Sequence, residues 1–433
     1  MGQGLFLEQH PVAAVPDVDP LASRRDALPG PASAPSVKGN LRLGFACIWE
    51  PVPQQTWSGS ASGLLEHLKL RTGTTDLGVH FPSLTRTALK ALHTHYRCGR
   101  FTTSWSYSRV THAYVAHSLE QSLRRHRGDR GIDAVLTIDT IADLREPFFA
   151  YYDSSWDLLI SGAASLREYA DLRLLTPSDV LRQRDRQLAV FESATGIVTM
   201  SHWLARSLVE QSEVPPQKVH VVPPGKPIGK AGSTDVKDDS AGRQSQHPRP
   251  EGDGRRRKLL FVGRLYNPYD FYRKGGDLVV AALQILRREY DPQITLTMVG
   301  IDNWPLPGEP PDGVDVRGVV PRDEIARLYE THDLFVMPSR MEPFGLVFAE
   351  ALGRGMPCIA RNACAMPEIV TPGVSGALID KDDAHELAAA IASVLVDDEI
   401  YKSCAARAPA ITEYFSWSRA AGEIVDVISK EIR

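Results

Sequence analysis

The stretch from Asp333 to Gly355 constrains the fold more than any other part of the chain. Residues 333–337 form a short apolar run without helical spacing, which is typical of a buried strand in a parallel sheet. After Gly345 the apolar residues recur at helical spacing, so a helix is predicted to begin there. A buried strand, a loop and a helix in this order form the repeating unit of a parallel α/β sheet.

The loop between this strand and this helix carries groups that suit an anionic ligand with hydroxyl groups. Glu342 lies before the helix start, and Glu350 follows about two turns into the helix. The backbone N–H groups at the helix start are expected to point at an anion, because the helix dipole favours negative charge there. The residues that supply them are Phe344, Gly345 and Leu346. The loop therefore offers a carboxylate for hydroxyls, a backbone cradle for phosphate and a second carboxylate for a ribose.

The rest of the chain repeats the same alternation of strands and helices. In the first half, strands are predicted at 41–49, 76–81, 134–138, 148–152, 196–200 and 219–222, and helices at 64–70, 110–124, 177–192 and 202–210. In the second half, strands are predicted at 258–264, 294–299, 314–320, 333–337 and 357–360, and helices at 277–288, 386–396 and 417–430. These repeats predict an α/β protein with doubly wound parallel sheets.

A chain of 433 residues is too long for one ordinary core, so two domains are expected. Residues 1–38 are rich in Pro, Ala, Ser and Asp without any period, which predicts a disordered arm. An N-terminal Rossmann-like domain is expected at 39–225 and a polar linker at 226–257. A C-terminal Rossmann-like domain is expected at 258–415, followed by a last helix at 416–433.

Composition excludes several classes of protein. A net charge of −4 argues against nucleic acid as a partner, since nucleic acid requires a basic face. No apolar run approaches the roughly 20 residues that a transmembrane helix needs. Five scattered cysteines suit a reducing compartment, which predicts a cytoplasmic protein. The basic run at 255–258 leaves peripheral contact with acidic lipid open, and the oligomeric state is also open.

Polar residues follow several predicted strands, where the ligands of such sheets bind. Arg264 comes directly after Gly263 at one strand end, and Lys274 lies ten residues later, so the two cations can converge on one pyrophosphate. In the first half, a loop follows the first strand, and Asp153 follows another strand. The loop contains Trp57, Ser58 and Gly59. A plain turn for the loop and a helix N-cap for the aspartate are the alternatives.

The two glutamates, seven residues apart on either side of Phe-Gly-Leu, resemble the signature of retaining glycosyltransferases of family four, group 1 type. The resemblance implies the GT-B fold, in which two Rossmann-like domains face each other across a cleft and the last helix crosses back to the first domain. It is specific from about residue 258 to 433 and only general from 41 to 225. The histidine that many members carry at a strand end of the first domain is missing, and Asp139 and Asp153 stand at such ends instead.

The resemblance also implies roles for the residues of the site. A nucleoside-diphosphate sugar would bind the C-terminal domain, and an acceptor with a free hydroxyl would bind the N-terminal domain. Val320 would border the base, Glu350 the ribose and Glu342 the donor sugar. The loop at 57–59 would lie between acceptor and donor, with Trp57, Ser58 and Asp153 as contacts to sugar or acceptor and Gly59 beside the diphosphate.

The expected activity is transfer of a sugar with retention of anomeric configuration. Arg264, Lys274 and the helix start at Gly345 would stabilise the departing diphosphate, so no metal and no cofactor are expected. Two alternatives remain open. One is an epimerase or hydrolase of the same fold that acts on nucleotide sugars, and the other is a non-catalytic protein that binds them.

Overall fold

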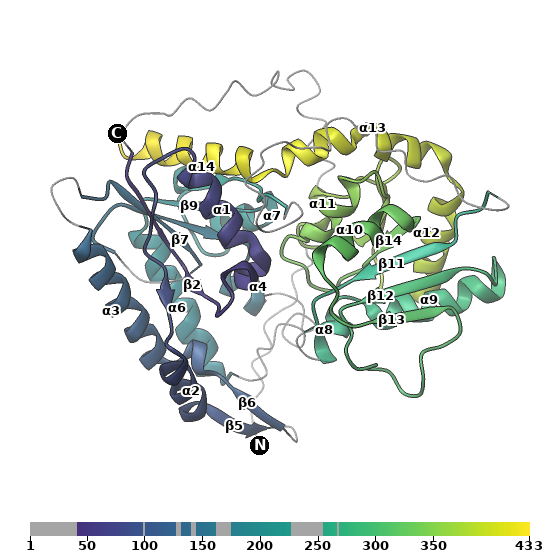
Figure 1. The fold of residues 1–433 in the computed structure, drawn as a ribbon, viewed down its shortest axis with the longest axis horizontal. Coiled ribbons are helices and arrows are strands. Elements are labelled where there is room, and N and C mark those ends of the chain that lie inside the picture. The colour runs from purple at the N-terminus through teal and green to yellow at the C-terminus, as the bar shows by residue number, and fades with distance from the viewer. Residues whose placement is uncertain are drawn as a thin grey trace.

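The computed structural model describes residues 41–97, 100–126, 131–139, 144–161, 175–226, 254–265 and 268–433. It consists of two α/β halves side by side, and the last helix of the chain lies along the first half (Figure 1). The arm predicted at 1–38 lies outside the described residues, as does most of the linker predicted at 226–257.

The first half is built on a six-stranded sheet in which every neighbouring pair is parallel. Its strands, in spatial order, are β10 (Val219–Val221), β9 (Gly196–Thr199), β8 (Phe148–Tyr152), β7 (Ala134–Ile138), β1 (Leu43–Ala46) and β3 (Thr75–Asp76). The chain leaves β1 for β3 on one side and then returns to β7 on the other. This sheet therefore has its topological switch point between β1 and β7.

The second half repeats the architecture with a second six-stranded parallel sheet. Its strands, in spatial order, are β13 (Val314–Arg317), β12 (Thr295–Val299), β11 (Lys258–Val262), β14 (Leu334–Val336), β15 (Cys358–Arg361) and β16 (Gly376–Ile379). The first strand lies in the middle, and the order reverses between β11 and β14. Leu259 and Leu260 pair with Leu334 and Phe335 across that reversal.

Helices cover the faces of both sheets, because the central strands are buried on both sides. Those of the first half are α1 (Ser60–Lys69), α2 (Ser83–Leu92), α3 (Arg109–Arg125), α4 (Trp156–Ser161), α6 (Pro177–Ser193) and α7 (His202–Glu210). Those of the second half are α8 (Pro268–Arg273), α9 (Gly276–Glu289), α10 (Arg322–Thr331), α11 (Leu346–Leu352), α12 (Ala384–Val396) and α13 (Asp398–Tyr414). The doubly wound α/β class predicted from the sequence is confirmed.

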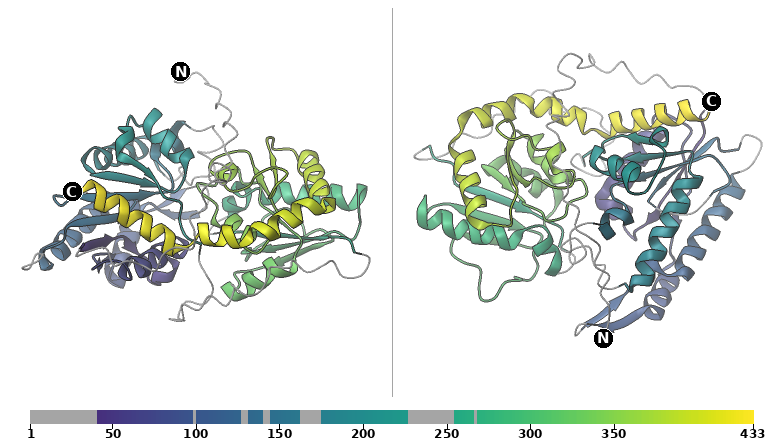
Figure 2. Two further views of the ribbon diagram at one scale, coloured as in Figure 1. Left: turned by 90° about the horizontal axis from the view of Figure 1, so that it is seen from above. Right: turned by 180° about the vertical axis from the view of Figure 1, so that it is seen from behind.

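The last helix, α14 (Trp417–Glu431), joins the two halves. It continues from α13 and runs back over the first half, as the two views of Figure 2 show. Trp417 packs tightly there, since a Cβ on Gly63 would lie 2.6 Å from its indole Nε1. A guanidinium N–H of Arg419 donates to the carbonyl of Pro223 at 2.5 Å. The helix that follows the second half in sequence therefore completes the core of the first.

Some local predictions differ from the structure. The strand predicted at 41–49 is interrupted at Cys47, because β2 (Ile48–Trp49) leaves the main sheet and pairs with β4 (Val79–His80). The strand predicted at 314–320 ends at Arg317, so Val320 lies in the loop before α10. Helices α2 and α10 were not predicted, nor was a hairpin of β5 (Thr94–Arg97) and β6 (Arg100–Thr103). Among the described residues, no helix is long and apolar enough to cross a membrane.

Candidate active site

The switch point of the second sheet brings together the two loops that the sequence analysis singled out. One segment follows β11, passes Gly263 and Arg264, and leads through α8 to the start of α9. The other follows β14 and leads through Glu342 to the start of α11. Because β11 and β14 are neighbouring parallel strands, both loops leave the sheet at the same edge. Ligands of open α/β sheets bind in the crevice at such a point.

Lys274 and Glu342 form an ion pair at this switch point. The ammonium Nζ of Lys274 donates to Oε2 of Glu342 at 2.8 Å, and both side chains are largely buried. The stem of Lys274 passes over Gly263, where a Cβ would lie 2.9 Å from its Cδ. A larger residue at 263 would therefore displace the lysine from its carboxylate partner.

The charge of Glu342 is stabilised by its surroundings. Burial alone would raise its pKa, but the positive charges of Lys274 and Arg273 outweigh that effect, so its pKa is lowered. Glu342 is therefore ionised at neutral pH, with Lys274 held against it. A carboxylate has about four acceptor positions, so binding one ammonium leaves capacity for the hydroxyls of a ligand.

Glycines allow the close approach of these loops. Gly275 has a left-handed φ of +75°, and a Cβ there would lie 2.6 Å from the carbonyl oxygen of Pro338. Gly300, at the end of β12, has φ +90°, and a Cβ there would lie only 1.7 Å from the carbonyl oxygen of Gly263. Both positions lack space for a side chain, and both require a backbone conformation that glycine adopts readily. They bring the Gly263 loop, the start of α9 and the Glu342 loop into contact.

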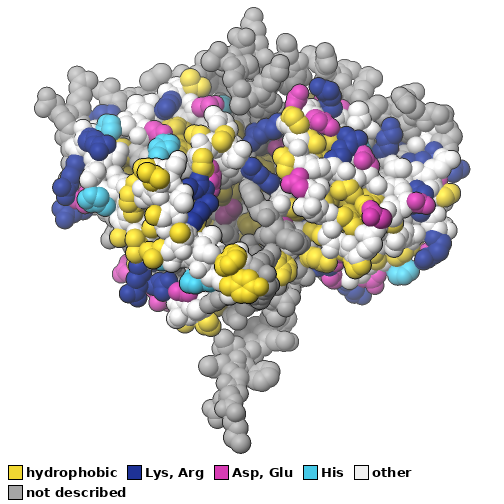
Figure 3. Space-filling view, turned by 60° about the horizontal axis from the view of Figure 1, so that its bottom comes forward, with side chains coloured by type: hydrophobic (Ala, Val, Ile, Leu, Met, Phe, Trp, Pro, Cys, Tyr) yellow, Lys and Arg dark blue, Asp and Glu magenta, His cyan; other side chains and the backbone are white. Residues whose placement is uncertain are grey.

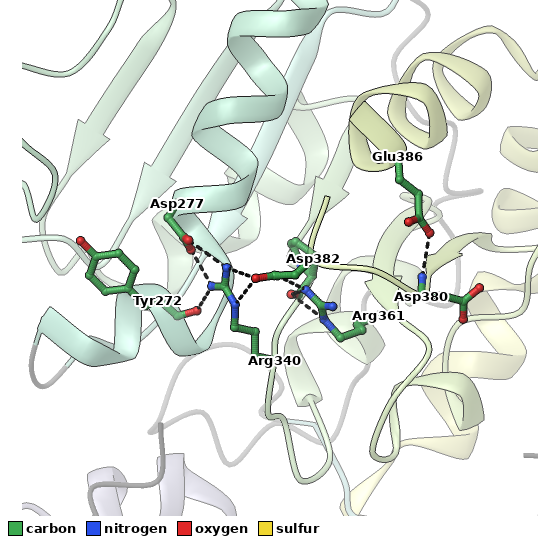
Figure 4. Close-up of polar contacts among 8 residues, drawn as sticks. Tyr272, Asp277, Arg340, Arg361, Asp380, Asp382 and Glu386 are labelled. Carbon is green, nitrogen blue, oxygen red and sulfur yellow. Dashed lines mark hydrogen bonds and ion pairs between the residues drawn. The ribbon is translucent and has the colours of Figure 1, made fainter. Parts of the chain in front are cut away.

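A buried arginine fixes the loop that carries Glu342. Arg340 binds Asp277 with two hydrogen bonds, of 2.7 and 2.9 Å, and binds Asp382 from its Nε and Nη2 at 2.9 and 2.7 Å (Figure 4). Arg361 lies on the other side of Asp382 and donates to it at 2.7 Å. Burial would raise the pKa of Asp382, but the two guanidinium groups outweigh that effect, so its pKa is lowered.

Backbone contacts reinforce this anchoring. The N–H of Arg340 donates to the carbonyl of Arg273 at 2.7 Å, and a guanidinium N–H of Arg273 donates to the carbonyl of Met341 at 3.1 Å. Arg340 also donates to the carbonyl of Tyr272. The segment before Glu342 is therefore tied directly to the segment before Lys274, which holds the two ends of the ion pair in register.

The start of α11 follows this loop. Gly345 is its N-cap residue and has a left-handed φ of +92°; no side chain of the described residues caps the helix there. Phe344 is buried and packs edge-on against Phe415, with ring centroids 6.0 Å apart. Leu346 is half-buried. The predicted helix start is confirmed, and its use as an anion cradle stays a prediction.

Glu350 lies within α11, beside α10. Its Oε2 accepts a hydrogen bond from the hydroxyl of Tyr329 at 3.2 Å. Burial raises the pKa of Glu350, against the opposing positive charges of Arg354, Arg322 and Lys226. A half-buried carboxylate of this kind is suited to accept hydrogen bonds from a diol, which is the role predicted for it.

The corresponding loop of the first half lies at the switch point of its own sheet, after β1 and β2. Trp57 and Ser58 have left-handed φ values of 50° and 57°, and Gly59 follows with φ 92°. Such values are unfavourable for residues with side chains and collect at functional sites. The carbonyl of Ser58 accepts a hydrogen bond of 3.0 Å from Arg322 at the start of α10, so this loop contacts the second half directly.

The carboxyl ends of the two sheets also meet at a second place. Glu368, which follows β15 in the short helix η6 (Met366–Glu368), accepts from the backbone N–H groups of His202 and Trp203 at 2.9 and 2.6 Å. Those groups form the start of α7, where a carboxylate is favoured by the helix dipole. Besides the contacts of α14, Arg322 with Ser58 and Glu368 with the start of α7 therefore both bridge the halves.

Two carboxylates lie at the strand ends of the first half. Asp139 follows β7 with a left-handed φ of 63°, and Asp153 follows β8. Burial, together with the negative charge of Asp139, raises the pKa of Asp153 to about 6. Burial lowers the pKa of Arg186 on α6, and the charge of Asp139 acts in the opposite direction. The strand ends that lack a histidine therefore hold a mutually repelling pair of aspartates.

Replacing Asp153 by asparagine is expected to stabilise the protein at pH 8 and to change little at pH 4.5. The folded protein holds the proton of Asp153 more tightly than the unfolded chain, so wild-type stability is highest below the ordinary aspartate pKa and falls as pH rises through 6. Urea unfolding at both pH values measures the difference. Asp185→Asn, an exposed position on the same half, serves as the control. Equal urea midpoints of unfolding for Asp153→Asn and wild type at pH 8 would contradict the raised pKa of Asp153.

The structure thus brings Gly263, Lys274 and Glu342 together at one switch point, and their roles toward a ligand stay predictions. Arg264 comes next to Gly263 and is exposed, while Val320 comes shortly before Arg322. The sequence reasoning missed three residues: Arg322, Arg340 and Glu368. The signal for Arg340 was present, since it stands two residues before Glu342. Arg322 and Glu368 act through partners 264 and 166 residues away, which the sequence does not indicate.

Solved structures share this architecture over nearly the whole chain. Sucrose-phosphate synthase from Thermosynechococcus elongatus matches with a TM-score of 0.61 and 17% identity, covering 90% of this chain and 99% of that one. A glycosyltransferase from Rickettsia africae matches with a TM-score of 0.60 and 16% identity, covering 91% and 99%. The fold is therefore GT-B, two Rossmann-like halves whose strand ends face each other.

Sequence comparison adds the family. Residues 242–410 match the model for glycosyl transferases group 1. These residues make up most of the second half, which is therefore similar to that family, and the resemblance noted from the two glutamates is confirmed.

Curated relatives of this chain carry the name D-inositol 3-phosphate glycosyltransferase. The relative from Thermobispora bispora is 28% identical over 56% of this chain and 58% of its own length. The relative from Segniliparus rotundus is 26% identical over 86% of this chain and 75% of its own length. That from Jonesia denitrificans is 30% identical over 59% and 62%. The chain thus spans less than two thirds of the length of the first of these relatives.

Proposed function

We propose that this protein is a retaining glycosyltransferase that moves a sugar from a nucleoside-diphosphate sugar to an acceptor hydroxyl. The observation that carries the proposal is the buried pair of Lys274 and Glu342 at the switch point of the family-matching half. It lies at the same edge of the sheet as the start of α11. A cation, a carboxylate and a helix start at one switch point are the groups that a sugar diphosphate requires.

The donor would extend along the edge of the second sheet. Lys274 and Arg264 would contact the diphosphate, with the N–H groups at the start of α11 on its other side. Glu342 would accept hydrogen bonds from hydroxyls of the sugar, and Glu350 from those of the ribose. Val320, in the loop before α10, would border the base.

The reaction would depend mainly on stabilising the leaving group. As the bond from the anomeric carbon to the phosphate oxygen breaks, negative charge collects on the diphosphate, which the nearby cations and helix start stabilise. The acceptor oxygen would form its bond on the face that the diphosphate leaves, and its proton would pass to the departing phosphate. This sequence retains configuration and requires no nucleophile from the protein.

The acceptor would lie against the first half, at the ends of β7 and β8. Trp57 and Ser58 would stand at the rim of that position, and Asp153 and Asp139 at its base. Carboxylates there suit an acceptor rich in hydroxyls. The curated relatives are named for inositol 3-phosphate, so this polyol phosphate is the first acceptor to test.

The decisive experiment measures the release of nucleoside diphosphate with a panel of nucleotide sugars, each with and without candidate acceptors. Release that requires an acceptor, with a product of unchanged anomeric configuration by NMR, supports the proposal. Epimerisation or hydrolysis without acceptor would replace it with the other enzyme class. Tight binding without turnover of any pair would identify a non-catalytic protein.

Activity is expected to persist in an excess of chelator, because protein cations are assigned to neutralise the diphosphate. The assay is diphosphate release by enzyme that has been dialysed against EDTA, compared with the same enzyme after Mg²⁺ is restored. A loss of activity that Mg²⁺ reverses would show that a metal ion shares this role.

A further inference from the structure

Helix α2 turns an apolar stripe toward solvent. Four apolar residues at helical spacing along this helix, Leu84, Ala88, Ala91 and Leu92, are exposed, and the exposed Thr87 lies among them. The two leucines are 86% and 66% exposed, whereas Leu89 is buried. A helix at the surface of a globular protein normally buries its apolar stripe. This one presents it outward, so its stripe is available to a partner.

The hairpin beside α2 extends the same surface. Tyr96 and Phe101 are opposite each other in β5 and β6, their ring centroids are 5.2 Å apart, and they are 67% and 78% exposed. The hydroxyls of Thr94 and Thr103 both donate to the carbonyl of Lys90, at 2.6 and 3.3 Å, which ties the hairpin to the helix. We call the exposed apolar residues of α2 together with Tyr96 and Phe101 the α2–hairpin surface.

The segment that carries this surface is basic, although one of its cations, Arg86, pairs with Glu50 at 2.8 Å. Residues 77–119 contain five Lys or Arg residues and no Asp or Glu, although the whole chain has a net charge of −4. Figure 1 places α2 and the hairpin at the end of the first half that is farthest from α14. Figure 3, which brings that end forward, shows hydrophobic and basic side chains there, with some acidic side chains beside them. The partner of this surface should therefore be anionic.

A second copy of the chain does not fit this requirement. A symmetric dimer places the same patch of both copies face to face, so the basic segments would oppose each other and repel. Exposed leucines and aromatic rings among basic side chains are instead the combination found where proteins lie in the interface of a bilayer. Large apolar side chains exposed close together in this way are a mark of interaction sites.

We propose that the α2–hairpin surface docks onto an anionic lipid bilayer. Its two leucines and two aromatic rings would enter the headgroup region, while basic side chains such as Lys90 and Arg109 would remain among the anionic headgroups. The contact is peripheral and holds the first half, where the acceptor is proposed to bind, against the membrane surface. It is independent of the donor site, which lies in the other half.

Vesicle flotation with the full chain tests this proposal. Vesicles of neutral phosphatidylcholine are compared with vesicles that contain phosphatidylglycerol, at low and at high salt. Binding is expected only to the anionic vesicles and is expected to weaken with salt. The double variant Leu84→Asp/Phe101→Ser should lose about tenfold or more in vesicle affinity. Both residues are highly exposed, so circular dichroism should show an unchanged fold.

A matched control separates this surface from general effects of charge and polarity. Leu181→Asp/Val396→Ser replaces an exposed leucine and an exposed apolar residue elsewhere, at 51% and 80% exposure, and should bind vesicles like the wild type. Equal losses in both double variants, or wild-type binding by Leu84→Asp/Phe101→Ser, would overturn the proposal. So would a dimer in analytical ultracentrifugation that only Leu84→Asp/Phe101→Ser dissociates, because the surface would then belong to a second copy. Failure of these tests leaves glycosyl transfer itself unaffected, since they measure binding alone.

Discussion

Replacing Lys274 by alanine is expected to lower turnover about 10²–10³-fold, as does loss of one oxyanion-stabilising donor. The ammonium lies at the switch point where the diphosphate is proposed to depart, and its help grows as negative charge develops on the leaving group. Donor affinity should fall less than turnover, since part of the interaction is realised only in the transition state. The measurement is diphosphate release at saturating donor and acceptor.

A companion variant separates chemistry from stability. Lys274→Ala leaves Glu342 buried without its ion-pair partner, which should destabilise the fold. Lys274→Ala/Glu342→Gln removes that unpaired charge, so it should recover stability in urea but no turnover. Lys402→Ala, an exposed lysine on α13, is the control and should retain both. Near-normal turnover of Lys274→Ala would show that the diphosphate lies elsewhere.

Arg264→Ala extends the same test. If both cations act on one diphosphate, the loss of transition-state stabilisation in the double variant should be smaller than the sum of the losses in the two single variants. Fully additive losses would mean that the two residues contact different groups. Lys274→Arg should restore activity only in part, because a planar guanidinium cannot replace a compact ammonium packed over Gly263.

Arg340→Ala is expected to reduce the free energy of unfolding by about 3 kcal/mol, the lower end of the range for a broken buried ion pair. The lower end applies because Asp382 is about half exposed, whereas Asp277 is more buried. The loop before Glu342 would also lose its ties to α9, so turnover should fall with stability. Urea unfolding and diphosphate release measure the two effects.

The control for this prediction is Arg317→Ala. Arg317 pairs with Asp315 and Glu324 at the surface, where ion pairs contribute about 0–1 kcal/mol. A stability loss for Arg340→Ala no larger than that for Arg317→Ala would show that the cluster in Figure 4 does not anchor the loop.

Both sheets could be predicted from the sequence because their central strands are short apolar runs that are buried on both faces. The runs predicted at 134–138, 148–152 and 258–264 were recognisable by their length and by their lack of helical spacing, although the third strand ends at Val262. The candidate site in the second half was also predictable. Lys274 and Glu342 each lie in a segment that follows a central strand, and such segments converge at a switch point.

Other elements could not be predicted from the sequence pattern. The apolar residues of α2 have helical spacing, but most of them face solvent, so their periodicity does not mark the core. Helix α13 contains Pro409, which is unfavourable inside a helix. The contacts of Arg322 and Glu368 join segments that are distant in sequence, and only the folded arrangement of the two halves places them together.

The crossing of α14 has a consequence for how the chain is made. The sheet of the first half is complete once β10 has been synthesised, but Ala420, Ile424 and Ile428, which are fully buried, belong to a helix made only after the entire second half. At about 5–20 residues per second, the ribosome needs on the order of 10–40 s to reach that helix. During that interval α14 does not yet cover the side of α1 that receives Trp417, so this apolar surface is open to aggregation and to chaperones.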